Sequence, residues 1–273
     1  MTQDLDVEYL PSLSIPDAGK IFESWKTRAA ATRAELPFKA NVRYGSHPRE
    51  VMDFYPAENA RGCVVFIHGG YWLEFSKVET SWVAKGFVGQ GISVALINYP
   101  LCPEVTIGQI RTSCAKAFAH LYKNVFSVAE RRAVVVSGHS AGGYLAASHL
   151  VEDWGPHGLP VDPIVGIVAL SGVFDVAPLI KTSLNTSLRL DDALAKALNL
   201  IAMQPRGVAK LLLAVGEQES AEFHRQSTDL SNSWAGLAPQ LINVAGTNHF
   251  TILDELAAPS GALNRLAVAM AHS

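Results

Sequence analysis

The chain has 273 residues, of which 49% are hydrophobic, and its formal net charge at pH 7 is −3. This length suits a single α/β domain, residues 1–273, with an insertion, and the apolar content is enough for a large core. Charges of both signs are scattered along the chain, which excludes an extended basic face for nucleic acid. No stretch approaches 18 uninterrupted apolar residues and the first residues show no apolar signal segment, so we expect no membrane partner and a cytoplasmic location.

In chain order, residues 1–38 contain a Pro- and Ser-rich lead and a helix-like stretch, and we expect them at the periphery. Segments 41–44 and 51–55 predict an antiparallel strand pair. Apolar strands then alternate with helices, which predicts a mostly parallel twisted sheet covered by helices on both faces. The expected strands are 63–67, 93–99, 133–137, 164–170, 210–215 and 240–245, and the expected helices are 78–90, 106–124, 141–151, 220–234 and 252–271. Residues 172–208 separate the sixth and seventh strands and predict a small cap insertion.

The motif Gly-His-Ser-Ala-Gly, residues 138–142, follows the apolar strand 133–137 directly and precedes a predicted helix. In this context the motif is typical of a nucleophile elbow, in which a sharp turn presents the serine hydroxyl. Ser140 is therefore the candidate nucleophile, and His139 is expected to point away from it into the scaffold. The alternative is a glycine-rich turn without chemistry.

A serine nucleophile needs a base and an acid that orients the base, and in this arrangement they follow the serine in the order acid, then histidine. His249 lies just after the last predicted strand and is the candidate base; a solvated loop histidine is the alternative. Glu219 and Glu217 both lie in the loop after the preceding strand, and the spacing favours Glu219. Asp175 remains as a third option, although it comes one strand too early.

The loop His-Gly-Gly-Tyr-Trp, residues 68–72, follows another buried strand, and its glycines let the backbone approach a substrate carbonyl. We expect the backbone N–H groups of Gly70, Tyr71 and Ala141 to form an oxyanion hole. Trp72 either borders the acyl group of the substrate or packs the loop onto the core.

No histidine pair has the spacing of a metal site, so we expect neither a metal nor a cofactor. The three cysteines show no CxxC spacing and are expected to be reduced core residues. The expected partner is a small amide or ester substrate, and the sequence leaves both a monomer and a homodimer as alternatives. A non-catalytic binding protein is the alternative to an enzyme, but it would usually lack a member of the triad.

Seven segments spread over nearly the whole chain carry further motifs: 9–12 (Tyr-Leu-Pro-Ser), 51–56, 68–72, 98–104, 171–179, 219–227 and 248–250. Together they resemble the kynurenine formamidase (arylformamidase) branch of the α/β-hydrolases, close to the hormone-sensitive-lipase-like esterases. The segment 68–72 is the most specific, because the lipase-like esterases usually carry a third glycine and no tryptophan there.

The resemblance implies an α/β-hydrolase fold and a small-acyl amidase or esterase. An N-formylkynurenine-type aryl formamide is the first expected substrate, and a general short-chain carboxylesterase with the same triad is the alternative. Two positions depart from the family pattern: Glu219 stands where the animal enzymes use Asp, and Tyr144 stands where many members place His. The expected substrate-binding residues are Tyr71, Trp72, Tyr144 and Phe250.

Overall fold

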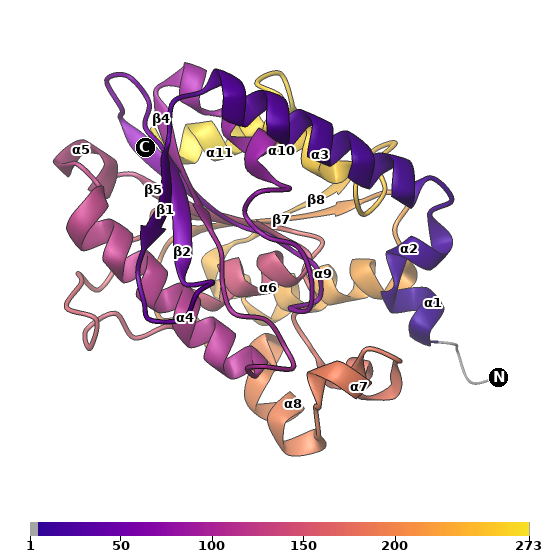
Figure 1. Ribbon diagram of the computed structural model, residues 1–273. Helices are drawn as coiled ribbons and strands as arrows, with labels where there is room; N and C mark the ends of the chain where they lie inside the picture. Colours follow the sequence, from indigo (N-terminus) through magenta and orange to yellow (C-terminus); the bar gives the residue numbers. More distant parts are fainter. Residues whose placement is uncertain (1–4, 273) are drawn as a thin grey trace.

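In the computed structural model, which describes residues 5–272, eight strands form one sheet between two layers of helices (Figure 1). The strand order is β1-β2-β4-β3-β5-β6-β7-β8, in which β2 pairs antiparallel with β1 and β4 and all other pairs are parallel. The strands are β1 Lys39–Arg43, β2 Val51–Tyr55, β3 Gly62–Ile67, β4 Ile92–Ile97, β5 Val134–His139, β6 Gly166–Leu170, β7 Lys210–Gly216 and β8 Gln240–Val244. The predicted sheet is thereby confirmed, with strand ends within about two residues of those expected.

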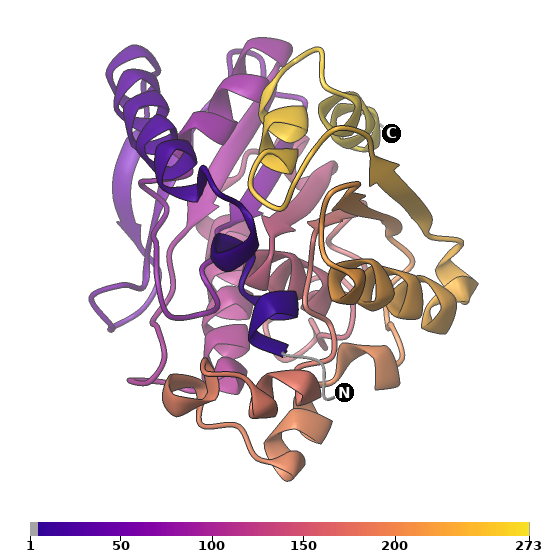
Figure 2. The ribbon, with the colours of Figure 1, turned by 90° about the vertical axis from the view of Figure 1, so that its right-hand side faces the viewer.

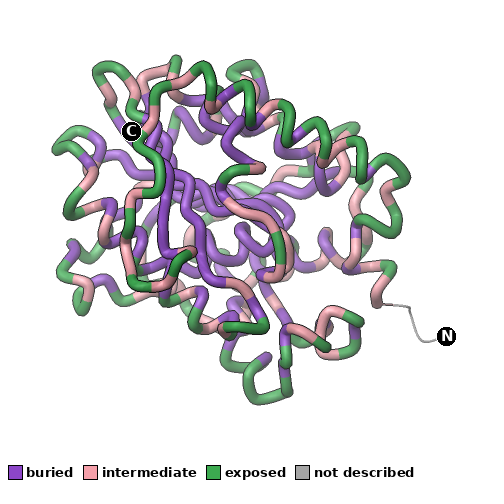
Figure 3. The backbone as a smooth tube through the Cα atoms, viewed as in Figure 1, coloured by how far each residue is buried: buried purple, intermediate pink, exposed green. Residues whose placement is uncertain are grey.

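The two helix layers bury opposite faces of the sheet (Figures 1 and 2). One layer contains α4 Ile107–His120, α6 Ala141–Ser148 and α9 Ala221–Ser233; the other contains α3 Ala18–Glu35, α10 Ile252–Ala257 and α11 Ala262–Met270. Successive side chains of a strand point to opposite faces. In β3, Val65 and Ile67 accordingly join the first core and Val64 and Phe66 join the second. Figure 3 shows the consequence: the central strands are buried along their length and the outer helix faces are exposed.

Two expected helices differ from the prediction. Residues 78–90 form only the short 3₁₀ turns η1 Ser81–Gly86 and η2 Val88–Gln90, because glycines interrupt the segment and disfavour a continuous helix. Residues 252–271 divide into α10 and α11 at Pro259, which cannot continue a helix. The remaining short elements are the π turn η3 Leu121–Val125, α5 Val128–Arg131 and η6 Ala235–Leu237.

The insertion 172–208 connects β6 to β7, and it contains η4 Ala177–Lys181, α7 Asn185–Leu188, α8 Asp192–Leu198 and η5 Leu200–Ala202. No helix within residues 5–272 is long and apolar enough to cross a bilayer. All three cysteines, Cys63, Cys102 and Cys114, are buried and free.

The N-terminal segment is not peripheral, which differs from the expectation. Its short helix α1 Leu5–Tyr9 lies against α9 and against η4 of the insertion, and α2 Pro11–Ser14 packs beside α1 (Figure 2). The Ser220 hydroxyl donates to the Glu8 carbonyl at 2.6 Å, and the Ser183 backbone N–H donates to Asp6 Oδ1 at 2.8 Å. The Tyr9 side chain is fully buried. These contacts hold the segment across the end of the sheet where the parallel strands finish.

Candidate active site

Ser140 occupies the sharp turn between β5 and α6 with φ 57° and ψ −121°, a conformation that non-glycine residues adopt at a cost of about 1–3 kcal/mol. The flanking glycines permit this turn. A Cβ atom on Gly138 would lie 2.0 Å from the carbonyl oxygen of Gly142, and one on Gly142 would lie 2.0 Å from that of Ile67. Any larger residue would therefore push helix and strand apart. Ala141, the first residue of α6, follows the serine directly.

Glu219 and His249 form a buried pair. His249 Nδ1 donates to Glu219 Oε2 at 2.6 Å. The other carboxylate oxygen, Oε1, accepts from the Ser171 hydroxyl and from the Gly216 backbone N–H, both at 2.6 Å. The carboxylate is fully buried, and a buried charge persists only when hydrogen bonds replace its hydration. These donors fix the carboxylate and, through it, the orientation of the imidazole.

The other two carboxylates have different partners. Glu217 is exposed, and its Oε2 accepts from the Gly246 N–H at 2.8 Å. Asp175 Oδ1 accepts from a backbone N–H two residues further along, at 3.0 Å, which closes a local turn. Of the three candidates, Glu219 is the one that contacts His249. Within residues 5–272, no group of three or more His, Cys, Asp or Glu side chains is arranged to hold a metal ion.

The loop after β3 adopts left-handed backbone at three successive positions. The φ angles are +99° at Gly70, 49° at Tyr71 and 59° at Trp72. Just before them, a Cβ atom on Gly69 would lie 3.1 Å from Ser140 Cβ and 2.8 Å from a carbonyl oxygen of the elbow. A glycine at position 69 is thus what allows the loop to lie directly against the serine.

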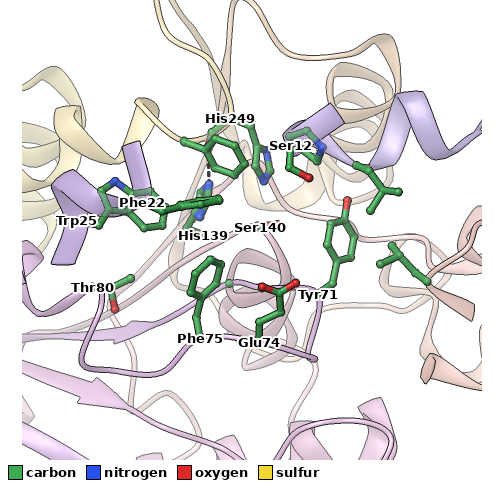
Figure 4. Close-up of a pocket in the computed structure, with 16 residues that line it drawn as sticks. Ser12, Phe22, Trp25, Tyr71, Glu74, Phe75, Thr80, His139, Ser140 and His249 are labelled. Carbon is green, nitrogen blue, oxygen red and sulfur yellow. Dashed lines mark hydrogen bonds between the residues drawn. The ribbon is translucent and has the colours of Figure 1, made fainter. Parts of the chain in front are cut away.

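His139 was expected to point into the scaffold, but it lines the pocket beside Ser140 (Figure 4). Its Nε2–H donates to the backbone carbonyl of His249 at 2.6 Å, and the two imidazole rings lie 4.7 Å apart. Burial lowers the pKa of His139 well below its usual range, so the ring is neutral and the carbonyl fixes its tautomer. His139 therefore holds the backbone of His249 in place.

A cavity of about 140 Å³ lies over Ser140 and His249 (Figure 4). It is lined by Leu10, Pro11, Ser12, Phe22, Trp25, Gly69, Gly70, Tyr71, Glu74, Phe75, Thr80, His139, Ser140, Leu184, His249 and Phe250. The N-terminal segment supplies five of these residues and the insertion 172–208 supplies Leu184 alone. Ser140 Oγ makes no hydrogen bond to the described residues, His249 included; catalytic bonds of this kind often form only when substrate is bound.

Two of the four expected substrate-binding residues line the cavity, namely Tyr71 and Phe250. Trp72 and Tyr144 do not. Both are fully buried and pack edge-to-face at 5.5 Å, and the Tyr144 hydroxyl donates to the Leu198 carbonyl at 2.8 Å. The left-handed turn at Trp72 directs its ring into the core beneath the oxyanion loop, so packing is its role.

The sequence interpretation missed the N-terminal wall of the cavity. Phe22 and Trp25 of α3 line the cavity together with Leu10 and the first two residues of α2. Tyr71 joins the two parts, because its hydroxyl donates to the Tyr9 carbonyl. The sequence signal was the pair of aromatic residues in a helix-like stretch, together with the Tyr-Leu-Pro-Ser motif at 9–12, but neither indicates which surface the segment covers.

A family model described as the alpha/beta hydrolase fold matches residues 64–258. The chain is 29% identical over 231 residues to kynurenine formamidase from Salmo salar, covering 79% of this chain and 76% of that protein. It is 27% identical over 289 residues to kynurenine formamidase from Danio rerio, covering 98% and 95%. These matches confirm the expected resemblance to that branch.

Among solved structures, a protein from Silicibacter sp. with a provisional description as a thioesterase is 32% identical, with a TM-score of 0.88 and 99% of each chain covered. Esterase B from Lactobacillus rhamnosis is 17% identical, with a TM-score of 0.68, 93% of this chain and 94% of that chain covered. At that identity the second likeness concerns the fold alone.

Proposed function

Because the chain belongs to the α/β-hydrolase family and is a hydrolase, we propose that it cleaves small-acyl aryl amides, first among them an N-formylkynurenine-type aryl formamide. The observation that carries this proposal is the buried Glu219–His249 pair, which shares one small aromatic cavity with the elbow residue Ser140. The kynurenine formamidases of two fish, which the chain resembles over most of its length, supply the choice of amide.

In the proposed mechanism, Ser140 Oγ attacks the formyl carbon while His249 Nε2 takes its proton, and Glu219 stabilises the resulting imidazolium. The developing oxyanion accepts hydrogen bonds from the backbone N–H groups of Gly70, Tyr71 and Ala141. His249 then returns the proton to the leaving nitrogen, and the arylamine departs. Water, deprotonated by the same imidazole, cleaves the formyl ester and regenerates the serine.

The size and lining of the cavity support a small aryl substrate. Its volume of about 140 Å³ is close to that of an engineered cavity of ~150 Å³ that binds benzene in another protein. The rings of Phe22, Trp25, Phe75 and Phe250 form one wall of the cavity. An anilide nitrogen also leaves more easily than an alkyl amine, which suits a triad with one acid–base histidine.

A short-chain carboxylesterase with the same triad is the second candidate, because the same serine, histidine and carboxylate can also cleave esters. To distinguish the formamidase from the carboxylesterase, we measure kcat/KM for N-formyl-L-kynurenine, formanilide, acetanilide and p-nitrophenyl esters of increasing chain length. The Ser140→Ala protein gives the background rate. We expect turnover of both formamides and a steep fall in kcat/KM beyond acetyl. An optimum at hexanoyl or longer, with no formamide cleaved, would exclude the formamidase and favour the esterase.

A further inference from the structure

The cavity contains a carboxylate that the proposed mechanism does not use. Glu74 lines it at an exposed position, and within residues 5–272 this carboxylate has no hydrogen bond or ion pair. No Lys or Arg lines the cavity, and His139 is neutral because burial lowers its pKa. Apart from the two histidines, Glu74 is therefore the one acidic or basic side chain among the residues that line the cavity.

The backbone around Glu74 is fixed relative to the oxyanion loop. The N–H groups of Leu73 and Glu74 donate to the Gly70 carbonyl at 2.8 and 3.0 Å, which closes a tight turn. The next carbonyl, that of Phe75, accepts from Arg49 Nη2 at 2.6 Å. Figure 4 shows the Glu74 carboxylate between Phe75 and Tyr71, directed toward the cavity below His249. The backbone is therefore anchored at the cavity, and the unpaired Glu74 carboxylate belongs to the same cavity lining as Ser140.

One wall of the cavity, which includes Phe75 next to Glu74, is apolar. The Phe22 ring lies 4.8 Å from the Phe250 ring and 5.3 Å from the Phe75 ring, and the Trp25 ring lies 6.1 Å from both Phe75 and Phe250. These rings offer a packing surface for the aryl group of a substrate, and Glu74 lies at the edge of that surface, next to Phe75. Aromatic faces also attract cations and offer nothing to anions.

We propose that Glu74 is a specificity-determining residue that selects aryl amides whose side chain carries an ammonium group. The inference rests on the proposed function, because it assumes that the aryl amide occupies this cavity. The inference adds to the proposed function that a carboxylate on the substrate finds no basic partner in the cavity and is repelled by Glu74. An amine without a carboxylate is therefore a better substrate than the corresponding α-amino acid.

The experiment uses four 2-formamidophenyl ketones whose side chains differ in charge: a primary amine (N-formylkynuramine), an α-amino acid (N-formyl-L-kynurenine), an uncharged methyl ketone and a carboxylic acid. We measure kcat and KM for the wild type, Glu74→Gln and Glu58→Gln. Glu58 is an exposed carboxylate in the turn between β2 and β3, so its variant controls for the change in net charge.

The wild type should prefer the amine over the uncharged ketone by about three- to tenfold in kcat/KM, mainly through KM, as expected for an ion pair with an exposed carboxylate. The α-amino acid should have a lower kcat/KM than the amine, and the carboxylic acid should have the lowest kcat/KM of the four. Glu74→Gln should remove the preference while retaining turnover of the uncharged ketone, whereas Glu58→Gln should keep it. An unchanged order of substrates in Glu74→Gln would overturn the proposal.

A second measurement does not depend on formamide cleavage. Kynuramine and the carboxylic acid of the same skeleton are tested as competitive inhibitors of p-nitrophenyl acetate hydrolysis. Tighter inhibition by the amine that weakens in Glu74→Gln supports the role of Glu74 even if no formamide is cleaved, in which case only the proposed function fails. Equal inhibition of wild type and Glu74→Gln by the amine refutes the role, whichever substrates are turned over.

Discussion

Replacing Glu219 by Gln is expected to abolish most of the activity while leaving the fold intact, and the hydrogen bonds around the carboxylate explain why. Oε1 accepts from the Gly216 N–H and the Ser171 hydroxyl, and Oε2 accepts from His249 Nδ1. A backbone N–H can only donate, so the glutamine must turn its carbonyl oxygen toward Gly216. Its NH₂ group then faces His249 and donates to Nδ1.

An imidazole that accepts at Nδ1 carries its proton on Nε2, and this tautomer cannot take the proton of Ser140. In a serine protease triad, the corresponding acid-to-amide change lowers kcat about 10⁴-fold, which corresponds to about 5.5 kcal/mol of activation free energy. Since the Glu219 carboxylate is fully buried and solvent cannot replace it, we expect a loss of about 10³- to 10⁴-fold.

The matched control is Glu217→Gln, in the same loop. The exposed Glu217 carboxylate accepts a hydrogen bond from the Gly246 N–H at 2.8 Å, and the amide oxygen of glutamine can accept the same bond. We expect less than about a twofold loss, as for a surface change. Both variants are assayed for kcat with p-nitrophenyl acetate and formanilide, with melting temperatures compared to the wild type. Equal losses, or a Glu219→Gln protein with more than about a tenth of wild-type kcat, would refute the assignment of the acid.

Four further outcomes are expected. Ser140→Ala should lower kcat by at least about 10³-fold at an unchanged melting temperature; a residual rate above about a tenth would exclude the elbow serine as nucleophile. Trp72→Ala should reduce the free energy of unfolding by about 3–5 kcal/mol without changing the acyl-length preference, because the ring is buried outside the cavity. A smaller fall in kcat/KM with increasing acyl length in this variant than in the wild type would contradict the prediction. Burial lowers the pKa of His68 to about 3, of His149 to about 4 and of His139 well below its usual range, so below about pH 6.5 these histidines bind protons only in the unfolded chain. The free energy of unfolding is therefore highest above about pH 6.5 and decreases as the pH falls from about 6.5 toward 4, by up to about 4 kcal/mol per pH unit for the three histidines together. Equal free energies of unfolding in urea at pH 7 and pH 5 would contradict this prediction. Prolonged EDTA treatment should leave the rate unchanged while a serine-directed organophosphate removes it, and loss to chelator with recovery on zinc would contradict the serine mechanism.

The order of strands and helices could be predicted because it depends on local patterns. Runs such as 63–67 and 133–137 are apolar without alternation, which indicates strands buried on both faces. The glycines around Ser140 and at 69–70 mark positions where a Cβ atom would collide with backbone, so their spacing along the chain indicates both the elbow and the oxyanion loop. The departures at 78–90 and at Pro259 arose where glycine and proline interrupt an otherwise helical pattern.

The substrate cavity could not be predicted in the same way, because its walls come from segments far apart in the sequence. By itself, the sequence indicated a tight turn at Ser140, the candidate base His249 and the candidate acid Glu219, since each follows a strand end by a short spacing. Only the tertiary structure decided that α2 and α3 contribute to the cavity, that Trp72 and Tyr144 turn into the core, and that Glu74 lines the cavity together with Ser140. Such outcomes depend on long-range packing: which apolar face covers which surface is set by contacts such as that of Tyr71 with Tyr9, and local propensity does not encode them.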